Sequence, residues 1–399
     1  MKDRIVTFDI IRGIAMIFII FFHSSIYNYD KIHLIDFSNP PLFIVLISFM
    51  ALWGGIFIIY SSILNTFVFL KRDEKNENSN FLKLSFFTFL FYILIHFSLN
   101  LIFGRWNVDF VNNTPSLTFV GAILRDRISQ FHPYEKLFDG SSISTIAFNI
   151  LFITFLQSFF KKMKLKRNLI YTFLFLTSFL TIFLSFTRVS LYSYFSILKE
   201  QNNFLPSLLL TFFLSNPYPL ITYFSYGLFG MLIGYLIFDG RKDLLKKLIL
   251  PSSILLILYG IFGLTKFPKT ISKPDYFWYF KTNFELGIFI LSIVSLYLIL
   301  EKRKNSLKRF SFVYNFSRVS LTIYFLEVLL SELFRKFYLK VNEGWNMDMN
   351  STFLFGFFNV IIWVIIVNVW SKFNFKYSFE YFWVKIFKIL GKDSSKLNI

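Results

Sequence analysis

The stretch R-G-I-A-M-I-F-I-I-F-F-H, residues 12–23, opens on an arginine and closes on a histidine, with no charged residue between them. With its apolar flanks it predicts a helix over residues 10–27, long enough to cross about 30 Å of hydrocarbon. Arg12 and His23 are just over three helical turns apart, so they share one face. Asp9 precedes Arg12 by one turn and can pair with it. The stretch therefore predicts a membrane helix with one polar face.

Two interpretations of this face stay open on the residues alone. Ionisable groups at membrane depth cost free energy and usually line a cavity or meet a partner. Alternatively, Arg12 snorkels to lipid headgroups and His23 is an interfacial residue near the end of the helix.

The composition extends the membrane interpretation to the whole chain. Of the 399 residues, 55% are hydrophobic and only 16% are charged, against about 25% charged in an ordinary soluble domain. Long apolar runs alternate with short basic clusters, which is typical of an all-α integral membrane protein that crosses the bilayer about ten times. The expected spans are residues 10–27, 42–70, 82–104, 142–160, 168–187, 218–238, 245–264, 283–300, 311–334 and 351–370. We expect residues 1–399 to form a single polytopic membrane domain.

The basic residues predict the orientation of the spans. Ten crossings place both termini on one side of the membrane, and the loops on that side hold 26 lysines and arginines against 14 on the other. Because positive charge is retained in the cytoplasm, both termini should be cytoplasmic, in the inner (cytoplasmic) membrane of the cell. This alternation also explains the net charge of +19 without nucleic acid, which we do not expect as a partner.

Two kinds of chemistry are not expected. The chain has no cysteine, which excludes disulfides, thiolate nucleophiles and thiolate metal ligands. Its four histidines lack the H-x-x-x-H and H-E-x-x-H spacings, so the sequence predicts no metal.

A second polar face lies in the ninth expected span. The sequence R-V-S-L-T-I-Y-F-L-E-V-L-L-S-E, residues 318–332, places Ser320, Tyr324, Glu327 and Ser331 on one side of a helix. Glu327 is deep in the apolar run, and a membrane carboxylate is by default a candidate functional group. A structural hydrogen bond to another helix is the alternative.

Other polar and small residues are weaker signals. His96 and Asn149 fall in the third and fourth expected spans, where they could share a depth with His23 or simply bond neighbouring helices. Gly227, Gly230 and Gly234 predict a surface for close helix packing. A short apolar run at residues 204–215 should be re-entrant or interfacial, and Arg125 is among the loop residues that could contact a polar substrate, if it is not simply solvated.

Four stretches resemble one protein family. R-I-V-T-F-D-I-I-R-G-I-A-M-I-F-I-I-F-F-H, residues 4–23, is similar to the opening of the transmembrane acyltransferase superfamily, which includes the acyltransferase-3 and heparan-α-glucosaminide N-acetyltransferase-like proteins. The matching signature is Asp9, the Arg12–Gly13 pair and His23. The other stretches are P-L-I-T-Y-F-S-Y-G-L-F-G-M-L-I-G (219–234), S-R-V-S-L-T-I-Y-F-L-E (317–327) and F-E-Y-F-W (379–383), the last resembling the bacterial branch.

The resemblance implies acyl transfer across the membrane. Cytoplasmic acyl-CoA, usually acetyl-CoA, would be the donor, and a hydroxyl or amine of a glycan or lipid-linked sugar would be the acceptor on the other side. It implies His23 as general base or transient acyl carrier, Arg12 as the donor anchor, and Asp9 as the group that orients Arg12. The substrate-binding candidates are Arg318, Ser320, Tyr324, Glu327, Asn149 and His96, of which Tyr324, Ser320 and Asn149 are candidate donors to the oxyanion. Membrane lipids are expected partners, and a homodimer is left open.

Two other classes compete with this interpretation. A secondary transporter or lipid-linked sugar flippase would also bury Glu and Arg at membrane depth, but such folds often carry inverted repeats and matched broken helices, which the sequence does not show. A membrane scaffold protein would not need Arg12 and His23 on one face.

Overall fold

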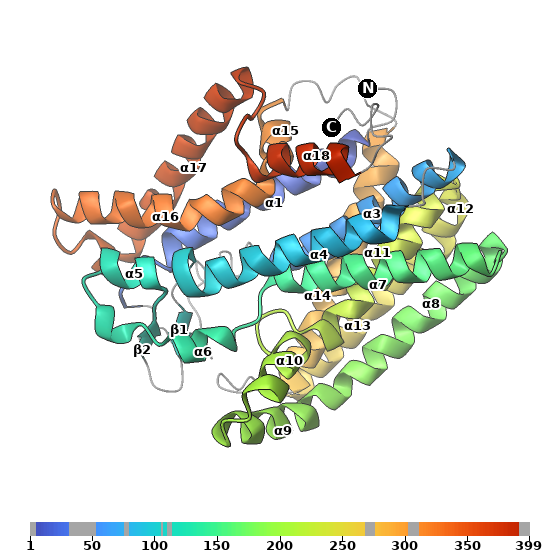
Figure 1. Cartoon of the computed structure of the whole chain (residues 1–399), viewed down its shortest axis with the longest axis horizontal. Helices are drawn as coiled ribbons and strands as arrows, with labels where there is room; N and C mark the ends of the chain where they lie inside the picture. Colours follow the sequence, from blue (N-terminus) through green and yellow to red (C-terminus); the bar gives the residue numbers. More distant parts are fainter. Residues whose placement is uncertain are drawn as a thin grey trace. The chain divides into compact units, whose positions relative to one another are not determined.

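The computed structural model describes residues 5–31, 53–75, 80–104, 107–109, 114–267, 276–301 and 311–390. Within these ranges the chain is helical apart from loops and one short antiparallel strand pair, β1 (Asn107–Asp109) and β2 (Thr114–Ser116) (Figure 1). Nine described helices are long and apolar enough to cross a membrane, which confirms an all-α multi-pass membrane protein. They are Val6–Ile26, Trp53–Glu74, Phe81–Phe103, Pro133–Lys162, Arg167–Glu200, Leu220–Phe238, Lys242–Lys266, Tyr276–Leu300 and Met349–Lys372.

The chain divides into two compact units, each assembled from separate segments. The first unit comprises Met1–Gly54, Phe97–Leu137 and Leu300–Ile399, and the second comprises Gly55–His96 and Phe138–Ile299. A single membrane domain over residues 1–399 stays a prediction.

The first unit is built around α1 (Val6–Ile26), which packs against α15 (Ser311–Arg318), α16 (Ser320–Leu339) and α17 (Met349–Lys372). Its shorter elements are η4 (Ser98–Phe103), α5 (Phe119–Leu124), η5 (Ile128–Gln130), α6 (Pro133–Leu137), η9 (Trp345–Met347) and α18 (Phe379–Leu390), together with β1 and β2. The contact of α1 with α15 is close because Gly13 has no side chain. A Cβ atom there would lie 2.1 Å from the Val313 carbonyl oxygen.

The predicted span over residues 311–334 is broken into α15 and α16, and neither helix is among the nine. Val319 interrupts the helix with a φ of −128°. The α16 segment also carries charged residues within its apolar run, since Glu327, Glu332, Arg335 and Lys336 lie within it. Four contacts join the 311–334 segment to α1 and the turn that follows it, and their order is the same along both segments. They are Ser317 with Asp9, Ser320 with Arg12, Glu327 with His23 and Ser331 with Asn28. Because α16 thus runs parallel to α1, we infer that it follows the same course through the membrane.

The second unit is centred on α11 (Leu220–Phe238), which packs against α3 (Ile56–Glu74), α7 (Ser142–Lys162) and α8 (Arg167–Leu184). Its other elements are α4 (Phe81–Phe97, up to His96), η6 (Ser185–Thr187), α9 (Arg188–Glu200), α10 (Phe204–Leu214), α12 (Lys242–Leu244), η7 (Leu245–Ile249), α13 (Leu250–Lys266) and α14 (Tyr276–Leu300). The turn η2 (Trp53–Gly55) precedes α3.

The glycines of α11 form the predicted packing surface. A Cβ atom on Gly230 would lie 2.5 Å from the Ile59 carbonyl oxygen, and one on Gly234 would lie 2.9 Å from the Thr66 Cβ atom. The short apolar run predicted at 204–215 is the helix α10, which is too short to span the membrane.

Candidate active site

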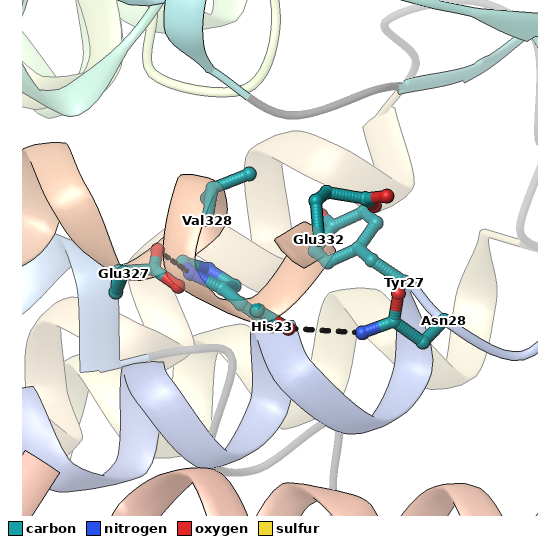
Figure 2. Close-up of a pocket in the computed structure, with 7 residues that line it drawn as sticks. His23, Tyr27, Asn28, Glu327, Val328 and Glu332 are labelled. Atoms are coloured by element: carbon teal, nitrogen blue, oxygen red, sulfur yellow. Dashed lines mark hydrogen bonds and ion pairs between the residues drawn. The ribbon is translucent and has the colours of Figure 1, made fainter. Parts of the chain in front are cut away.

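The first unit contains a buried histidine–carboxylate pair. His23 projects from α1 toward α16, and its Nδ1 atom lies 2.5 Å from the Glu327 Oε1 atom (Figure 2). The side chains are 7% and 0% exposed, respectively. The helical spacing of α1 places His23 toward α16, and the spacing of α16 places Glu327 opposite it. The pair thus joins the two polar faces that the sequence indicates.

A cavity lies beside this pair. It is small, with room for about one water molecule, and is partly open to the outside; Figure 2 draws its lining residues. They come from α1, the turn that follows it and α16, all within the first unit: His23, Tyr27, Asn28, Glu327, Val328, Ser331 and Glu332. An imidazole and a carboxylate therefore face a small space with hydroxyl and amide groups around it.

The pairing determines which nitrogen of His23 can act as a base. A carboxylate accepts hydrogen bonds, so the Nδ1 atom carries the proton and donates it toward Glu327, an assignment made from the hydrogen-bond partner. Nε2 then bears the lone pair that can take a proton from a nucleophile. Were the ring protonated there, the carboxylate would stabilise the imidazolium, as the third member of a catalytic triad does.

Arg12 contacts α16, as His23 does, whereas Asp9 contacts α15. The Arg12 Nε atom donates to the Ser320 Oγ atom at 2.8 Å, and the Ser317 hydroxyl donates to the Asp9 Oδ1 atom at 2.9 Å. Arg12 is partly exposed, whereas Asp9 is buried. Asp9, Arg12 and His23 therefore lie on one face of α1, as the spacing predicts, with about 16 Å between Arg12 and His23 along the axis.

Glu380 on α18 fixes the start of α16. Its carboxylate accepts from the Leu321 backbone N–H at 2.7 Å and from the Thr322 hydroxyl at 2.6 Å, so it caps the first turn after the break at Val319. Burial raises the pKa of Glu380, and the Thr322 hydroxyl and the charge of Arg12 oppose that rise. The cap holds the turn of α16 that carries Ser320, the partner of Arg12.

A cluster of charged residues adjoins the cavity through Glu332. The Arg125 Nε atom donates to both Glu332 carboxylate oxygens at 3.1 Å, and the Arg335 Nε atom donates to Glu332 at 2.8 Å. Burial lowers the pKa of Arg125, and Glu332 raises it again. Asn28 and Glu332 were not among the residues predicted for the site, although Glu332 follows Glu327 by five positions in the quoted stretch.

Two more predicted residues of the first unit, Tyr324 and Arg318, make ring contacts. The centroid of the Tyr324 ring is 6.4 Å from that of His23. The Arg318 guanidinium lies over the Phe375 ring at 4.8 Å. A role in substrate binding for Arg318, Ser320 and Tyr324 stays a prediction.

His96 and Asn149 belong to the second unit. The His96 Nδ1 atom is 2.7 Å from the Ser141 hydroxyl, and the Asn149 side-chain amide donates to the Thr145 carbonyl at 3.0 Å. The Asn149–Thr145 bond lies within α7, and the Asn149 amide also donates to the Tyr223 carbonyl of α11 at 3.5 Å, which is the helix–helix contact that the sequence left open. Substrate binding by either residue stays a prediction.

Comparison of the chain with protein-family models, with curated proteins and with solved structures finds no match. The chemistry of the site therefore has to be argued from the first unit's own residues.

Proposed function

We propose that the protein is a membrane acyltransferase that moves an acyl group, acetyl in the simplest case, from acyl-CoA to a hydroxyl or amine. The acceptor would belong to a glycan or a similar molecule on the extracytoplasmic side. The observation that carries the proposal is the buried His23–Glu327 pair at the edge of a cavity. General-base activation of a nucleophile is the chemistry that such a pair supports best.

The reaction can be written with its atoms in balance. The acceptor hydroxyl gives its proton to His23 Nε2 as its oxygen attacks the thioester carbonyl carbon. The tetrahedral intermediate collapses, the carbon–sulfur bond breaks, and the CoA thiolate leaves with the proton that His23 returns. The products are an ester and free CoA, and Glu327 stays ionised throughout. An amine acceptor gives an amide by the same steps, and transient acylation of His23 is the alternative route.

Arg12 supports the proposal from the opposite end of the same helix face. A guanidinium binds phosphate and amide oxygens well. It lies about 16 Å along the helix axis from His23, so a long flexible arm such as pantetheine could extend between them. We assign Arg12 to donor binding, Ser320 and Glu380 to holding it in place, and Asp9 to fixing α1 against α15 through Ser317.

The proposal includes an orientation in the membrane. With the basic loops in the cytoplasm, the N-terminal end of α1 lies at the inner side and His23 lies in the outer half. The donor would then bind from the cytoplasm and the acceptor from outside, in the cytoplasmic membrane.

A direct assay tests the proposal. Purified protein with acetyl-CoA should release CoA, with water as the acceptor that takes the acyl group as acetate, and a thiol reagent can follow this without protein background because the chain has no cysteine. His23→Ala should reduce the rate by at least about 100-fold, since general-base catalysis contributes roughly 10²–10⁴-fold. His132→Ala is the matched control, because that histidine is exposed. Full activity of His23→Ala in the folded protein would defeat the mechanism.

The same preparation separates the proposal from its rival. A secondary transporter or flippase would move its solute across liposomes without an acyl donor and would release no CoA from acetyl-CoA. That outcome would replace the acyltransferase by a transporter.

A further inference from the structure

We infer that the Ser331 hydroxyl donates the hydrogen bond that stabilises the oxyanion of the tetrahedral intermediate. The inference rests on the proposed acyl transfer at His23 and adds a catalytic residue to it. None of the oxyanion candidates expected from the sequence is this serine.

Ser331 is placed for this role by α16. It follows Glu327 by one helical turn, about 6 Å along the axis, and lines the same cavity. The side chain is 3% exposed, so a hydrogen bond from it acts in surroundings from which water is largely excluded.

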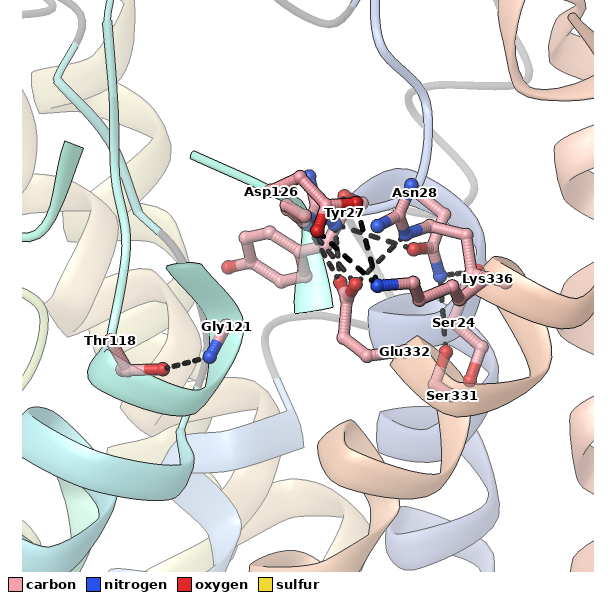
Figure 3. Close-up of polar contacts among 11 residues, drawn as sticks. Ser24, Tyr27, Asn28, Thr118, Gly121, Asp126, Ser331, Glu332 and Lys336 are labelled. Atoms are coloured by element: carbon pink, nitrogen blue, oxygen red, sulfur yellow. Dashed lines mark hydrogen bonds and ion pairs between the residues drawn. The ribbon is translucent and has the colours of Figure 1, made fainter. Parts of the chain in front are cut away.

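The hydroxyl of Ser331 has a proton to give. Its Oγ atom accepts from the Asn28 Nδ2 atom at 3.0 Å, which engages a lone pair rather than the O–H group (Figure 3). Among the residues that the structure describes, no acceptor for the Ser331 O–H is found, although many serines in this chain donate to the carbonyl one turn earlier, as Ser25 does to Phe21. The Ser331 proton is therefore available to a ligand in the cavity.

The orientation of the Asn28 side chain is set by its other contacts. Nδ2 also donates to the Ser24 carbonyl at 2.8 Å, a contact that the amide oxygen could not make. The Oδ1 atom faces Arg125, whose guanidinium donates to it at 3.5 Å. Asn28 therefore presents an N–H to Ser331 and its oxygen to a cation.

These contacts form a series of hydrogen bonds that run in one direction, each residue donating to the next. Arg125 donates to Asn28, Asn28 donates to Ser331, and Ser331 donates into the cavity. Each bond in such a chain polarises the next and strengthens the last donor. The series of hydrogen bonds begins at the buried Arg125 guanidinium, which Glu332 holds, so the Ser331 hydroxyl at its other end favours a negatively charged acceptor. Donors fixed in advance toward developing charge are the arrangement that stabilises an oxyanion.

The candidates expected from the sequence are less suitable. Ser320 accepts a hydrogen bond from Arg12, which lies at the end of α1 that we assign to binding acyl-CoA. Tyr324 does not line the cavity, and Asn149 lies in the second unit.

The test compares serine variants of the full-length protein in the acetyl-CoA assay. Ser331→Ala should lower kcat by about 10²–10³-fold, the usual cost of losing one oxyanion donor, with KM for acetyl-CoA changed less than about twofold. Ser331→Thr keeps the hydroxyl and should retain most of the rate. Ser24→Ala is the matched control, because it removes a buried hydroxyl from the facing helix and keeps the carbonyl that holds Asn28. Should the alanine variant not fold, Ser331→Cys replaces it, since a thiol is a similar size but a weak donor.

The outcomes separate the inference from the proposed function. An unchanged kcat in Ser331→Ala, with His23→Ala inactive, would overturn the role of Ser331 and leave the acyltransferase standing. A raised KM at constant kcat would also overturn it, because the bond would then form in the ground state. Absence of CoA release from the unaltered protein would defeat both.

Discussion

At the scale of single residues, the site depends on two side chains that are 304 positions apart in sequence. In the proposed mechanism, Glu327 orients the His23 ring and stabilises the charge that it acquires as a base. A glutamine at position 327 would keep the shape, but an amide oxygen offers no charge to the imidazolium.

Glu327→Gln should therefore lower kcat by about 10²–10⁴-fold with little change in KM, since the carboxylate acts mainly when His23 is protonated. CoA release at saturating acetyl-CoA measures it. Glu343→Gln is the matched control, because Glu343 is exposed in the loop before α17. Equal activity of the two variants would remove Glu327 from the mechanism.

Arg12→Ala should mainly weaken donor binding. Removing a charge-assisted contact should raise the dissociation constant for CoA by about 10-fold or more, measured by titration calorimetry. Arg241→Ala is a control, since this exposed arginine pairs only with the neighbouring exposed Asp243 among described residues. A dissociation constant that does not change would reject the anchoring role of Arg12.

The sequence predicts part of this site, and the reason is physical. Helical periodicity fixes which side chains share a face, so the grouping of Asp9, Arg12 and His23 follows from local spacing alone. The partner of His23 depends on which helices pack together, and no local pattern in α1 specifies that. Asn28 escapes prediction for the same reason, since its role comes from contacts with α16 and with Arg125.

At the scale of elements, the broken helix α15–α16 is the main departure from the expected spans. An uninterrupted helix is the simplest interpretation of residues 311–334, because Val319 is neither proline nor glycine. The break is held by Glu380, a residue that lies far along the chain on α18. As a consequence, the Glu380 carboxylate lies at the first turn of α16, beside Ser320, which accepts a hydrogen bond from Arg12.

The close contact between α1 and α15 makes Gly13 sensitive to substitution. In Gly13→Ala the new methyl group would lie 2.1 Å from the Val313 carbonyl oxygen and 2.6 Å from its Cγ1 atom, so the two helices must separate. We expect a loss of roughly 1–3 kcal/mol, the usual range for an overpacked site. Thermal unfolding in detergent measures it, and an unfolding temperature equal to that of the unaltered protein would contradict the packing of these helices.

At the scale of the whole molecule, composition was sufficient to predict the fold class, because crossing hydrocarbon requires long apolar helices with satisfied backbones. The ninth expected span, residues 311–334, differs from the others because it is broken into α15 and α16, and Glu327, Glu332 and Arg335 lower the mean hydropathy of α16. If α16 crosses the membrane beside α1, it would be the crossing that the predicted alternation of basic loops requires.

Cysteine labelling tests this orientation in a chain that has no native thiol. Lys166 and Glu343 are both exposed, whereas Trp345 nearby is buried, so the first two are suitable positions. An impermeant maleimide should label Glu343→Cys in intact cells and should label Lys166→Cys only after permeabilisation. Labelling of position 166 from outside would overturn the predicted topology, and the unaltered chain shows the background.

The polar contacts between α1 and the α15–α16 segment also bear on biosynthesis. Asp9, Arg12 and His23 emerge from the ribosome first, yet their partners follow 304–308 residues later. At about 5–20 residues per second, the first helix waits on the order of 15–60 s for these partners. During that interval its ionisable groups need another polar environment, such as the insertion machinery or water at the bilayer surface. A chain that terminates before residue 317 lacks these partners, and we expect quality-control proteases to degrade it because the polar groups of its first helix stay without them.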